Sequence, residues 1–224
     1  MKTDARLGQE INTYLRAKGV ETPVLIRPPG YPEISDESKI KTISHHIARI
    51  METLGLDLSD DSLKDTPDRV GKMYINEIFR GLDYDHFPKC TAVDNKMKYD
   101  EMVIERNITA ISVCEHHLVT IDQKVDIAYI PSQKVLGLSK LNRIAKFFAQ
   151  RPQIQERYVE QVFHAMEYIL GTSDIAVVVR GKHYCVAQRG VEDTSSFTIT
   201  SKLGGSFKEN PAQRKEFMDL VRSN

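Results

Sequence analysis

Hydrophobic residues recur at helical spacing in the first part of the chain. Between residues 40 and 54, isoleucine and leucine return at steps of three or four positions, which places them on one face of an amphipathic helix. Ser35 or Asp36 can cap the start of this helix, and Gly55 can end it. We therefore predict an amphipathic helix between these residues.

Two further helices are predicted around it. Asp4 can cap a first helix that ends near Gly19, and a proline-rich stretch at residues 22–32 separates it from the next helix. A third helix is expected at 66–81, where a Thr-Pro pair supplies a cap and a proline at the first helical position. Residues 1–95 are therefore predicted to form an N-terminal helical region.

The pattern changes to short β-branched runs after residue 101. Valine, isoleucine and threonine are concentrated in four segments, which we predict to be strands. These segments are residues 102–113, 124–130, 175–187 and 195–202.

Two helices are predicted between the second and third strands. Ser139 is expected to cap the first of them, which ends near Gln150 ahead of an Arg-Pro pair. The second helix carries an apolar stripe over residues 154–169 and ends at Gly171. A short polar helix is expected to close the chain.

The order strand, strand, helix, helix, strand, strand limits the fold. Short connections within each strand pair favour antiparallel hairpins, and both helices then lie on one face of the sheet. We predict an α+β domain at residues 96–224, built on a four-stranded antiparallel sheet. Such a sheet has two open edges, which natural proteins cover or pair, so subunits are expected to join edge to edge.

Composition narrows the class of partners. Lys and Arg total 31 and Asp and Glu total 31, so the formal net charge is zero and gives no general attraction to nucleic acid or to a membrane surface. The start of the chain is polar, and its apolar runs fall well short of the roughly 20 residues of a membrane-spanning helix. We expect a cytoplasmic protein with no nucleic-acid and no membrane partner.

Cysteine and histidine residues occur at spacings typical of a metal site. The chain has three cysteines, a number that does not suggest a disulfide scaffold. Cys114 and His117 stand three positions apart at the end of a predicted strand. His183 and Cys185 are expected on another strand, with their side chains facing the same way. Thiolate sulfur and imidazole nitrogen together suit Zn²⁺.

Two kinds of metal site remain open at this point. Four protein ligands make a closed structural site, whereas three ligands leave a position for water in a catalytic site. Cys114, His117 and Cys185 are the three main candidates, and His183 would close the site as a fourth ligand. The simpler alternative is a chance Cys-x-x-His pair with inert, buried cysteines. Cys90, in a predicted loop, is interpreted as structural or incidental.

Several motifs appear in a defined order along the chain. They are CEHH at 114–117 with VTID at 119–122, GLSKLNR at 137–143 with FAQRPQ at 148–153, HYCV at 183–186, and RGV at 189–191. The series resembles the type I GTP cyclohydrolase family. The resemblance extends back to TPDRV at 66–70 and FRGL at 79–82, and so covers most of the chain from about Ser35.

The resemblance implies a tunnelling fold, in which sheets from several subunits form a barrel. It also implies a homo-oligomer, commonly a decamer of stacked rings, with active sites at subunit interfaces where allosteric cooperativity could arise. The implied reaction converts GTP and water to 7,8-dihydroneopterin triphosphate and formate, the first step of folate or tetrahydrobiopterin synthesis. Cys114, His117 and Cys185 are the zinc ligands that the resemblance assigns.

Other functional residues are carried over by matching positions. His116 and His183 match the family's acid–base histidines, and histidine suits this role because its pKa lies near neutral pH. The alternatives are that His116 only holds His117 in place and that His183 acts from outside the metal site. Glu156 matches the guanine-binding glutamate, and Gln155 beside it is expected to contribute a backbone contact.

The triphosphate is expected to bind to cations and to a helix N-terminus. Ser139 lies at the predicted helix start, with Lys140 and Arg143 in the first turns, which offers free N–H groups and two positive charges. Arg69 and Arg189 are the further phosphate contacts that the resemblance assigns. Without the resemblance, each charged residue is more simply interpreted as a solvated surface group.

Two other functions are compatible with parts of the pattern. A non-catalytic nucleotide or pterin sensor would keep the fold and the metal as structure. Loss of a ligand or of the histidine pair would favour it, yet all of these residues are present. A pterin synthase or a nitrile reductase of the same fold is expected to use three histidines for zinc or a lone nucleophilic cysteine. The ligand set, together with Lys140 and Arg143, therefore favours the cyclohydrolase.

Overall fold

The computed structural model describes residues 2–25 and 34–223. Of the proline-rich stretch predicted at 22–32, residues 26–32 lie outside the described residues. None of the helices in the described part of the chain is both long enough and apolar enough to cross a membrane. Helices and strands are mixed along the chain, which confirms the general class predicted from the sequence.

Helices dominate the N-terminal part of the chain, and strands begin at residue 92. The α-helices are α1 Ala5–Ala17, α2 Asp36–Thr53, α3 Thr66–Met73, α4 Leu138–Ala149, α5 Gln155–Leu170, α6 Tyr184–Ala187, α7 Gly205–Glu209 and α8 Pro211–Arg222. A π-helix, η1 Tyr74–Ile78, and two 3₁₀ turns, η2 Arg80–Leu82 and η3 Tyr84–His86, follow α3. The strands are β1 Ala92–Asp94, β2 Val103–Cys114, β3 Thr120–Tyr129, β4 Lys134–Leu136, β5 Pro152–Gln153, β6 Ile175–His183 and β7 Thr198–Leu203.

Within the described residues, the main sheet has five strands in the order β5-β2-β3-β6-β7. The pairs β2–β3, β3–β6 and β6–β7 are antiparallel, and the two-residue strand β5 runs parallel to the end of β2. A separate small sheet pairs β1 with β4. The sequence predicted the four long strands, but it did not predict β5, which borders the end of β2 where Cys114 lies.

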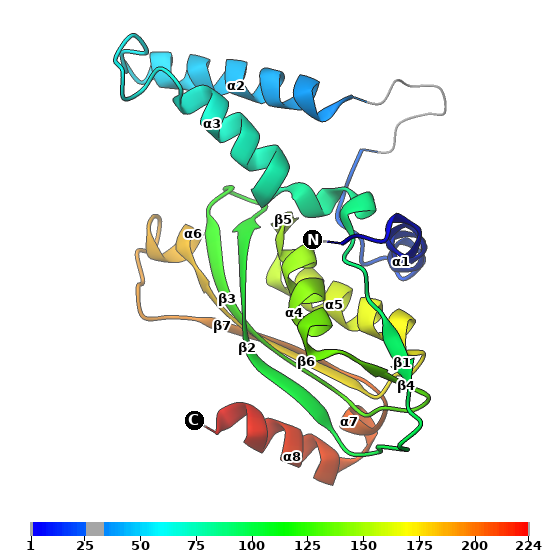
Figure 1. Cartoon of the computed structure of the whole chain (residues 1–224). Helices are drawn as coiled ribbons and strands as arrows, with labels where there is room; N and C mark the ends of the chain where they lie inside the picture. Colours follow the sequence, from blue (N-terminus) through cyan, green and yellow to red (C-terminus); the bar gives the residue numbers. More distant parts are fainter. Residues whose placement is uncertain (1, 26–33, 224) are drawn as a thin grey trace.

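Both faces of the main sheet are covered, over different lengths. Helices α4 and α5 lie on one face, with α1 beside them (Figure 1). Ile11 of α1 and Val177 of β6 belong to the same buried cluster on this side. On the other face α7 and α8 cover one end of the sheet, where Phe207 and Phe217 pack with Val178. Neighbouring β6 residues point to opposite faces, so this strand is buried from both sides.

Helices α2 and α3 project from one end of the sheet (Figure 1). Ser35 caps α2 by accepting a hydrogen bond from the Ser38 backbone N–H at 3.3 Å, which confirms one of the two predicted caps. Of the apolar stripe predicted on this helix, Ile50 is 55% exposed and Leu54 is 73% exposed. The stripe is therefore only partly covered within one chain.

Some predicted boundaries were wrong. The strand predicted at 175–187 ends at His183 and continues as the helical turn α6. Because its partner β3 begins at Thr120, opposite this point, the ladder ends there, and Cys185 does not lie on the same strand as His183. Helix α4 is capped at Gly137 rather than at Ser139, which lies inside its first turn.

The third predicted helix is also interrupted. Its α-helical part ends at Met73, and π and 3₁₀ turns follow. Gly81 lies against the end of α4: its N–H donates to the carbonyl of Gln150 at 2.9 Å. A Cβ atom at position 81 would stand 2.1 Å from the carbonyl oxygen of Phe147. This close approach requires glycine, and it fixes where the projecting helices join the body.

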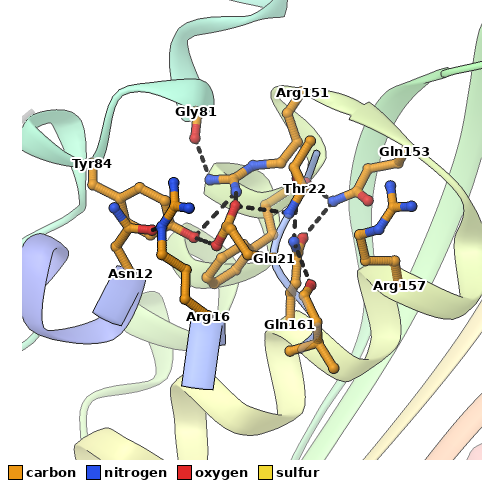
Figure 2. A network of polar contacts seen from close by, with 12 residues as sticks. Asn12, Arg16, Glu21, Thr22, Gly81, Tyr84, Arg151, Gln153, Arg157 and Gln161 are labelled. Carbon is orange, nitrogen blue, oxygen red and sulfur yellow. Dashed lines mark hydrogen bonds and ion pairs between the residues drawn. The ribbon is translucent and has the colours of Figure 1, made fainter. Parts of the chain in front are cut away.

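A buried arginine joins the N-terminal region to the sheet. Arg151, between α4 and β5, is 0% exposed, and Figure 2 shows its guanidinium between Gly81, Tyr84 and Glu21. It donates to Glu21 Oε1 at 3.0 Å, to the Tyr84 hydroxyl at 3.2 Å and to the Gly81 carbonyl oxygen. Tyr84 in turn donates to Glu21. One cation thus connects three segments that are distant in the sequence.

Aromatic rings surround the same guanidinium. Its central carbon lies 5.0 Å from the ring centroids of Tyr84 and Phe147 and 4.9 Å from that of Phe148, distances at which a cation is attracted by a ring face. Burial raises the pKa of Tyr84 well above its usual value, so its hydroxyl remains a hydrogen-bond donor. Because the neutral phenol supplies no negative charge, the Glu21 carboxylate compensates the charge of Arg151.

We predict that Glu21→Ala lowers the free energy of unfolding by about 3–5 kcal/mol, because it leaves a buried guanidinium without its counter-charge. Urea denaturation followed by circular dichroism measures this loss. The matched control is Glu52→Ala, because Glu52 pairs with Arg49 at 2.6 Å on the surface of α2 and its removal should cost less than about 1 kcal/mol. Equal losses in the two variants would contradict this account of Arg151.

Candidate metal centre and active site

The hairpin between β2 and β3 holds two of the candidate metal ligands. Cys114 is the last residue of β2; its N–H donates to the Val119 carbonyl and its carbonyl accepts from Leu118 N–H, both at 2.8 Å. Leu118 has a left-handed backbone with φ of 53°, a conformation that costs about 1–2 kcal/mol for a non-glycine residue. This tight turn brings His117 back toward Cys114.

The third candidate ligand comes from the end of β6. His183 is paired with Ile121, near the start of β3, and the chain then turns into α6, which carries Cys185. Cys114, His117 and Cys185 each offer one donor atom, and these three atoms lie within 4.8 Å of one another. The structure therefore brings together the three residues that the sequence pattern singled out.

The donor set fits a transition-metal ion. Two sulfurs and one imidazole nitrogen are preferred ligands of zinc, and a tetrahedral site with Zn–S bonds of about 2.3 Å places its sulfurs roughly 3.8 Å apart. The observed spread of at most 4.8 Å is close to that value. His183 is not in the cluster, and its Nε2 lies 2.8 Å from Gln155 Oε1. Three protein donors correspond to a site that keeps one position open.

Electrostatics at the cluster also favour a cation. Burial raises the pKa of the Cys185 thiol, and the neighbouring Cys114 raises it further, because two thiolates repel each other. Arg189 opposes this effect from nearby, and it lies 3.0 Å from His117 Nε2. A metal ion bound by these groups would offset this repulsion, because its positive charge would stabilise both thiolates.

The two predicted acid–base histidines are close to the candidate ligands along the chain. His116 is exposed, and its Nδ1 lies 3.8 Å from Cys114 Sγ. His183 is partly buried, and burial lowers its pKa while the nearby Glu156 carboxylate partly offsets this effect. A lowered pKa keeps the imidazole neutral at pH 7, the form that can accept a proton.

The start of α5 lies beside the β2–β3 hairpin that carries Cys114 and His117 (the metal hairpin), because β5 pairs with β2. Cys114 is opposite Gln153 in this ladder, and the Glu115 N–H donates to the Gln153 carbonyl at 3.0 Å. Glu156 follows in the first turn of α5 and is exposed, whereas Gln155 is only 1% exposed. Of this pair, only Glu156 has a side chain that is free to meet a ligand.

An ion pair that the sequence analysis missed supports the same corner. Arg157 on α5 contacts both carboxylate oxygens of Glu115, at 2.5 and 3.4 Å. Bidentate pairs of this kind are among the stronger surface interactions. The pair links the metal hairpin to the helix that carries Glu156. Glu115 stands inside the CEHH motif, but no spacing in the sequence indicated its partner.

The predicted phosphate residues lie apart from the cluster within one chain. Helix α4 begins just after β4, and Leu136 of β4 is hydrogen-bonded to the hydroxyl of Tyr129, the last residue of β3. The metal hairpin is at the other end of this ten-residue strand, about 30 Å away. Ser139, Lys140 and Arg143, in the first turns of α4, are thus on the far side.

The remaining two predicted phosphate contacts lie on other elements than α4. Arg69 lies on the projecting helix α3 and donates to the Ser62 carbonyl at 3.3 Å. Arg189 lies at the metal cluster, against His117. Of the five predicted phosphate contacts, Arg189 is the one that contacts a candidate metal ligand within the described chain.

The sequence model of the family described as GTP cyclohydrolase I matches residues 43–222. A protein of Citrobacter koseri named GTP cyclohydrolase 1 is 53% identical over 212 residues, which are 95% of this chain and 94% of that protein. The protein of the same name from Salmonella arizonae is 52% identical over the same shares. The chain belongs to the GTP cyclohydrolase I family.

Among solved structures, the archaeosine synthase QueF-Like in the apo form is a remote likeness to this GTP cyclohydrolase I family member. It is 16% identical, with a TM-score of 0.37, and the match covers 46% of this chain and 93% of that one. This similarity is too slight to bear on function. The family match includes every predicted site residue from Arg69 to Arg189.

We predict that Cys185→Ala abolishes metal binding, because two donors cannot replace the three that converge here. Metal content per chain, measured by elemental mass spectrometry on the purified protein, checks this. Cys90→Ala is the matched control: burial raises the pKa of the Cys90 thiol to about 12, and this residue is not in the cluster, so its variant should keep the metal. His116→Ala should also keep the metal. Normal metal content in Cys185→Ala would remove Cys185 from the ligand set.

Proposed function

We propose that this member of the GTP cyclohydrolase I family converts GTP and water to formate and 7,8-dihydroneopterin triphosphate, with Zn²⁺ held by Cys114, His117 and Cys185. The observation that carries the proposal is the convergence of these three donors beside two histidines and Glu156. When bound, the zinc ion supplies the Lewis acidity that makes a water molecule nucleophilic at neutral pH.

The chain's own residues supply binding and proton transfer. His183 and His116 act as the acid–base groups at the guanine ring nitrogen and at the ribose ring oxygen, because an imidazole exchanges protons readily near neutral pH. His116 lies beside Cys114 and His183 is two residues before Cys185 in the chain, which supports this role. Proton transfer at the ring nitrogen promotes ring opening once water has added at C8.

Glu156 is proposed to recognise guanine. A carboxylate accepts the two adjacent N–H groups of guanine as a pair, whereas adenine presents a different edge. Glu156 lies in the first turn of α5, and its side chain is exposed. An unmatched adenine would leave the carboxylate without partners, which is costly in a closed site.

The separation of the phosphate residues supports an active site between subunits. Ser139, Lys140 and Arg143 begin α4 at the far end of β3, and Arg69 lies on the projecting helix α3. In this proposal a neighbouring copy contributes these four residues, and Arg189 comes from the chain that holds the metal. The free edge of β7, with Ile199 59% exposed, is available to another strand. We propose that sheets join in this way into a tunnelling-fold barrel and that the rings stack into a decamer.

Further expectations from the sequence remain part of this proposal. Division of the chain into a helical region at 1–95 and a catalytic domain at 96–224 is retained, although α1 shares a buried cluster with the sheet. We place the enzyme in the cytoplasm, with GTP as its substrate and without nucleic-acid or membrane partners. Interface sites in a ring are compatible with allosteric cooperativity.

The first test is GTP turnover by the purified, metal-loaded protein, with formate and pterin fluorescence followed together. We predict that both products form, that chelation abolishes both, and that zinc restores them. ATP should be turned over at less than about a tenth of the GTP rate, because it does not match Glu156. Absence of product with bound zinc and an intact fold would favour a nucleotide sensor instead.

We also predict that two inactive variants restore each other's activity when they assemble together. Cys185→Ala lacks the metal but keeps the phosphate-binding residues. Arg143→Ala keeps the metal ligands but lacks one of the phosphate-binding residues. In a random equal mixture about a quarter of the interfaces would combine the two intact halves, so about a quarter of the wild-type rate is expected. Co-expression with two affinity tags provides the mixed oligomer. If both halves came from one chain, no activity would return.

A further inference from the structure

The buried side chain of Gln155 has a role that the sequence did not indicate. Gln155 is the first residue of α5 and is 1% exposed. Its Nε2 contacts three oxygen acceptors: the Val179 carbonyl at 3.1 Å, the Thr198 carbonyl at 3.0 Å and the Thr200 hydroxyl at 3.1 Å. Two of these acceptors are backbone carbonyls, which cannot donate, so the nitrogen end of the amide must face them.

This orientation determines the state of the histidine beside it. With its nitrogen directed at β6 and β7, Gln155 turns its Oε1 toward His183 Nε2, 2.8 Å away. An amide oxygen can only accept a hydrogen bond. His183 Nε2 must therefore carry the hydrogen, and in the neutral ring Nδ1 is left with its lone pair.

Gly181 provides the space for this contact. It lies on β6 two residues before His183, on the same side of the strand. A Cβ atom at position 181 would stand 2.2 Å from Gln155 Oε1 and 3.1 Å from Gln155 Cδ. The first distance is far shorter than a normal contact and the second is tight, so an alanine would push the amide away from the histidine.

We propose that Gln155 is a positioning residue that fixes the ring and the tautomer of His183, so that Nδ1 is the nitrogen that exchanges a proton with the substrate. The catalytic part of this statement rests on the proposed function. The proposal adds a role for the side chain to the backbone contact expected of Gln155. Gly181 is a second requirement for the hydrogen bond between Gln155 and His183, because any larger residue would occupy the space of the Gln155 amide.

The kinetic test uses two substitutions that break the contact from opposite sides. Gln155→Met keeps the length of the side chain and removes its polar atoms, and Gly181→Ala displaces the amide without removing it. In the metal-loaded enzyme each should lower kcat by about ten- to a hundredfold, as loss of an orienting partner typically does. KM for GTP should stay within about threefold, because no group that binds the substrate has been removed. Metal content should be unchanged.

The matched control is Gln161→Met, the same change on the same helix. Gln161 is also fully buried, and its amide donates to the Val20 carbonyl at 3.0 Å and to the Thr22 hydroxyl at 3.2 Å. Its loss should lower stability while leaving kcat near the wild-type value. If Gln155→Met and Gln161→Met had the same kcat, Gln155 would be merely structural and the proposal would be wrong.

The tautomer is measured independently of turnover. Nitrogen NMR of ¹⁵N-histidine-labelled, metal-loaded protein at pH 8, with the His183 signals assigned from a His183→Ala sample, should show hydrogen on Nε2 in the wild type. Gln155→Met should show a mixture or a shift to Nδ1. Hydrogen on Nδ1 in the wild type, or on both nitrogens, would overturn the proposal even if GTP turnover were confirmed. The expected tautomer without turnover would instead count against the proposed function alone.

Discussion

The antiparallel register of β3 between β2 and β6 is the constraint on which the site depends. It places the β2–β3 turn beside the end of β6, so that Cys114 and His117 meet Cys185 although about 70 positions separate them in the chain. A shift of one residue in such a ladder would turn every side chain to the other face. The buried residues on both sides of β6 make that shift costly, because core packing on both faces would be lost.

Several polar contacts at one corner hold the start of α5 against this ladder. The two-residue strand β5, the Glu115–Arg157 ion pair and the Gln155 amide each connect α5 or its approach to β2, to the metal hairpin or to β6 and β7. Behind them Arg151 joins the preceding loop to the N-terminal region through Glu21 and Gly81. These connections hold the candidate metal ligands, the histidines and Glu156 in fixed positions relative to one another, and catalysis by proximity requires such an arrangement.

The residues predicted to bind phosphate lie on other elements. Some are at the start of α4, at the opposite end of β3 from the metal hairpin, and Arg69 is on α3, which projects from the body together with α2. Exposed apolar residues on α2 and β7 show surface that one chain leaves uncovered. An enzyme acting on a substrate as long as a nucleoside triphosphate can use both regions only if copies of the chain bring them together, which is why assembly and catalysis are proposed to be coupled.

The sequence alone determined the elements with strong periodicity, because apolar spacing and caps are local properties. Helix α2 begins after its predicted cap Ser35. Three candidate metal ligands were singled out because cysteine and histidine are uncommon and their spacing is restrictive, and the structure brings their donor atoms together. The turn of the chain after His183 was missed, since it depends on where the partner strand β3 begins and not on the residues of β6 themselves. The role of the Gln155 side chain, the space left by Gly181 and the partner of Glu115 were also undetermined. They rest on contacts between segments 24 to 45 positions apart, which only the tertiary structure decides.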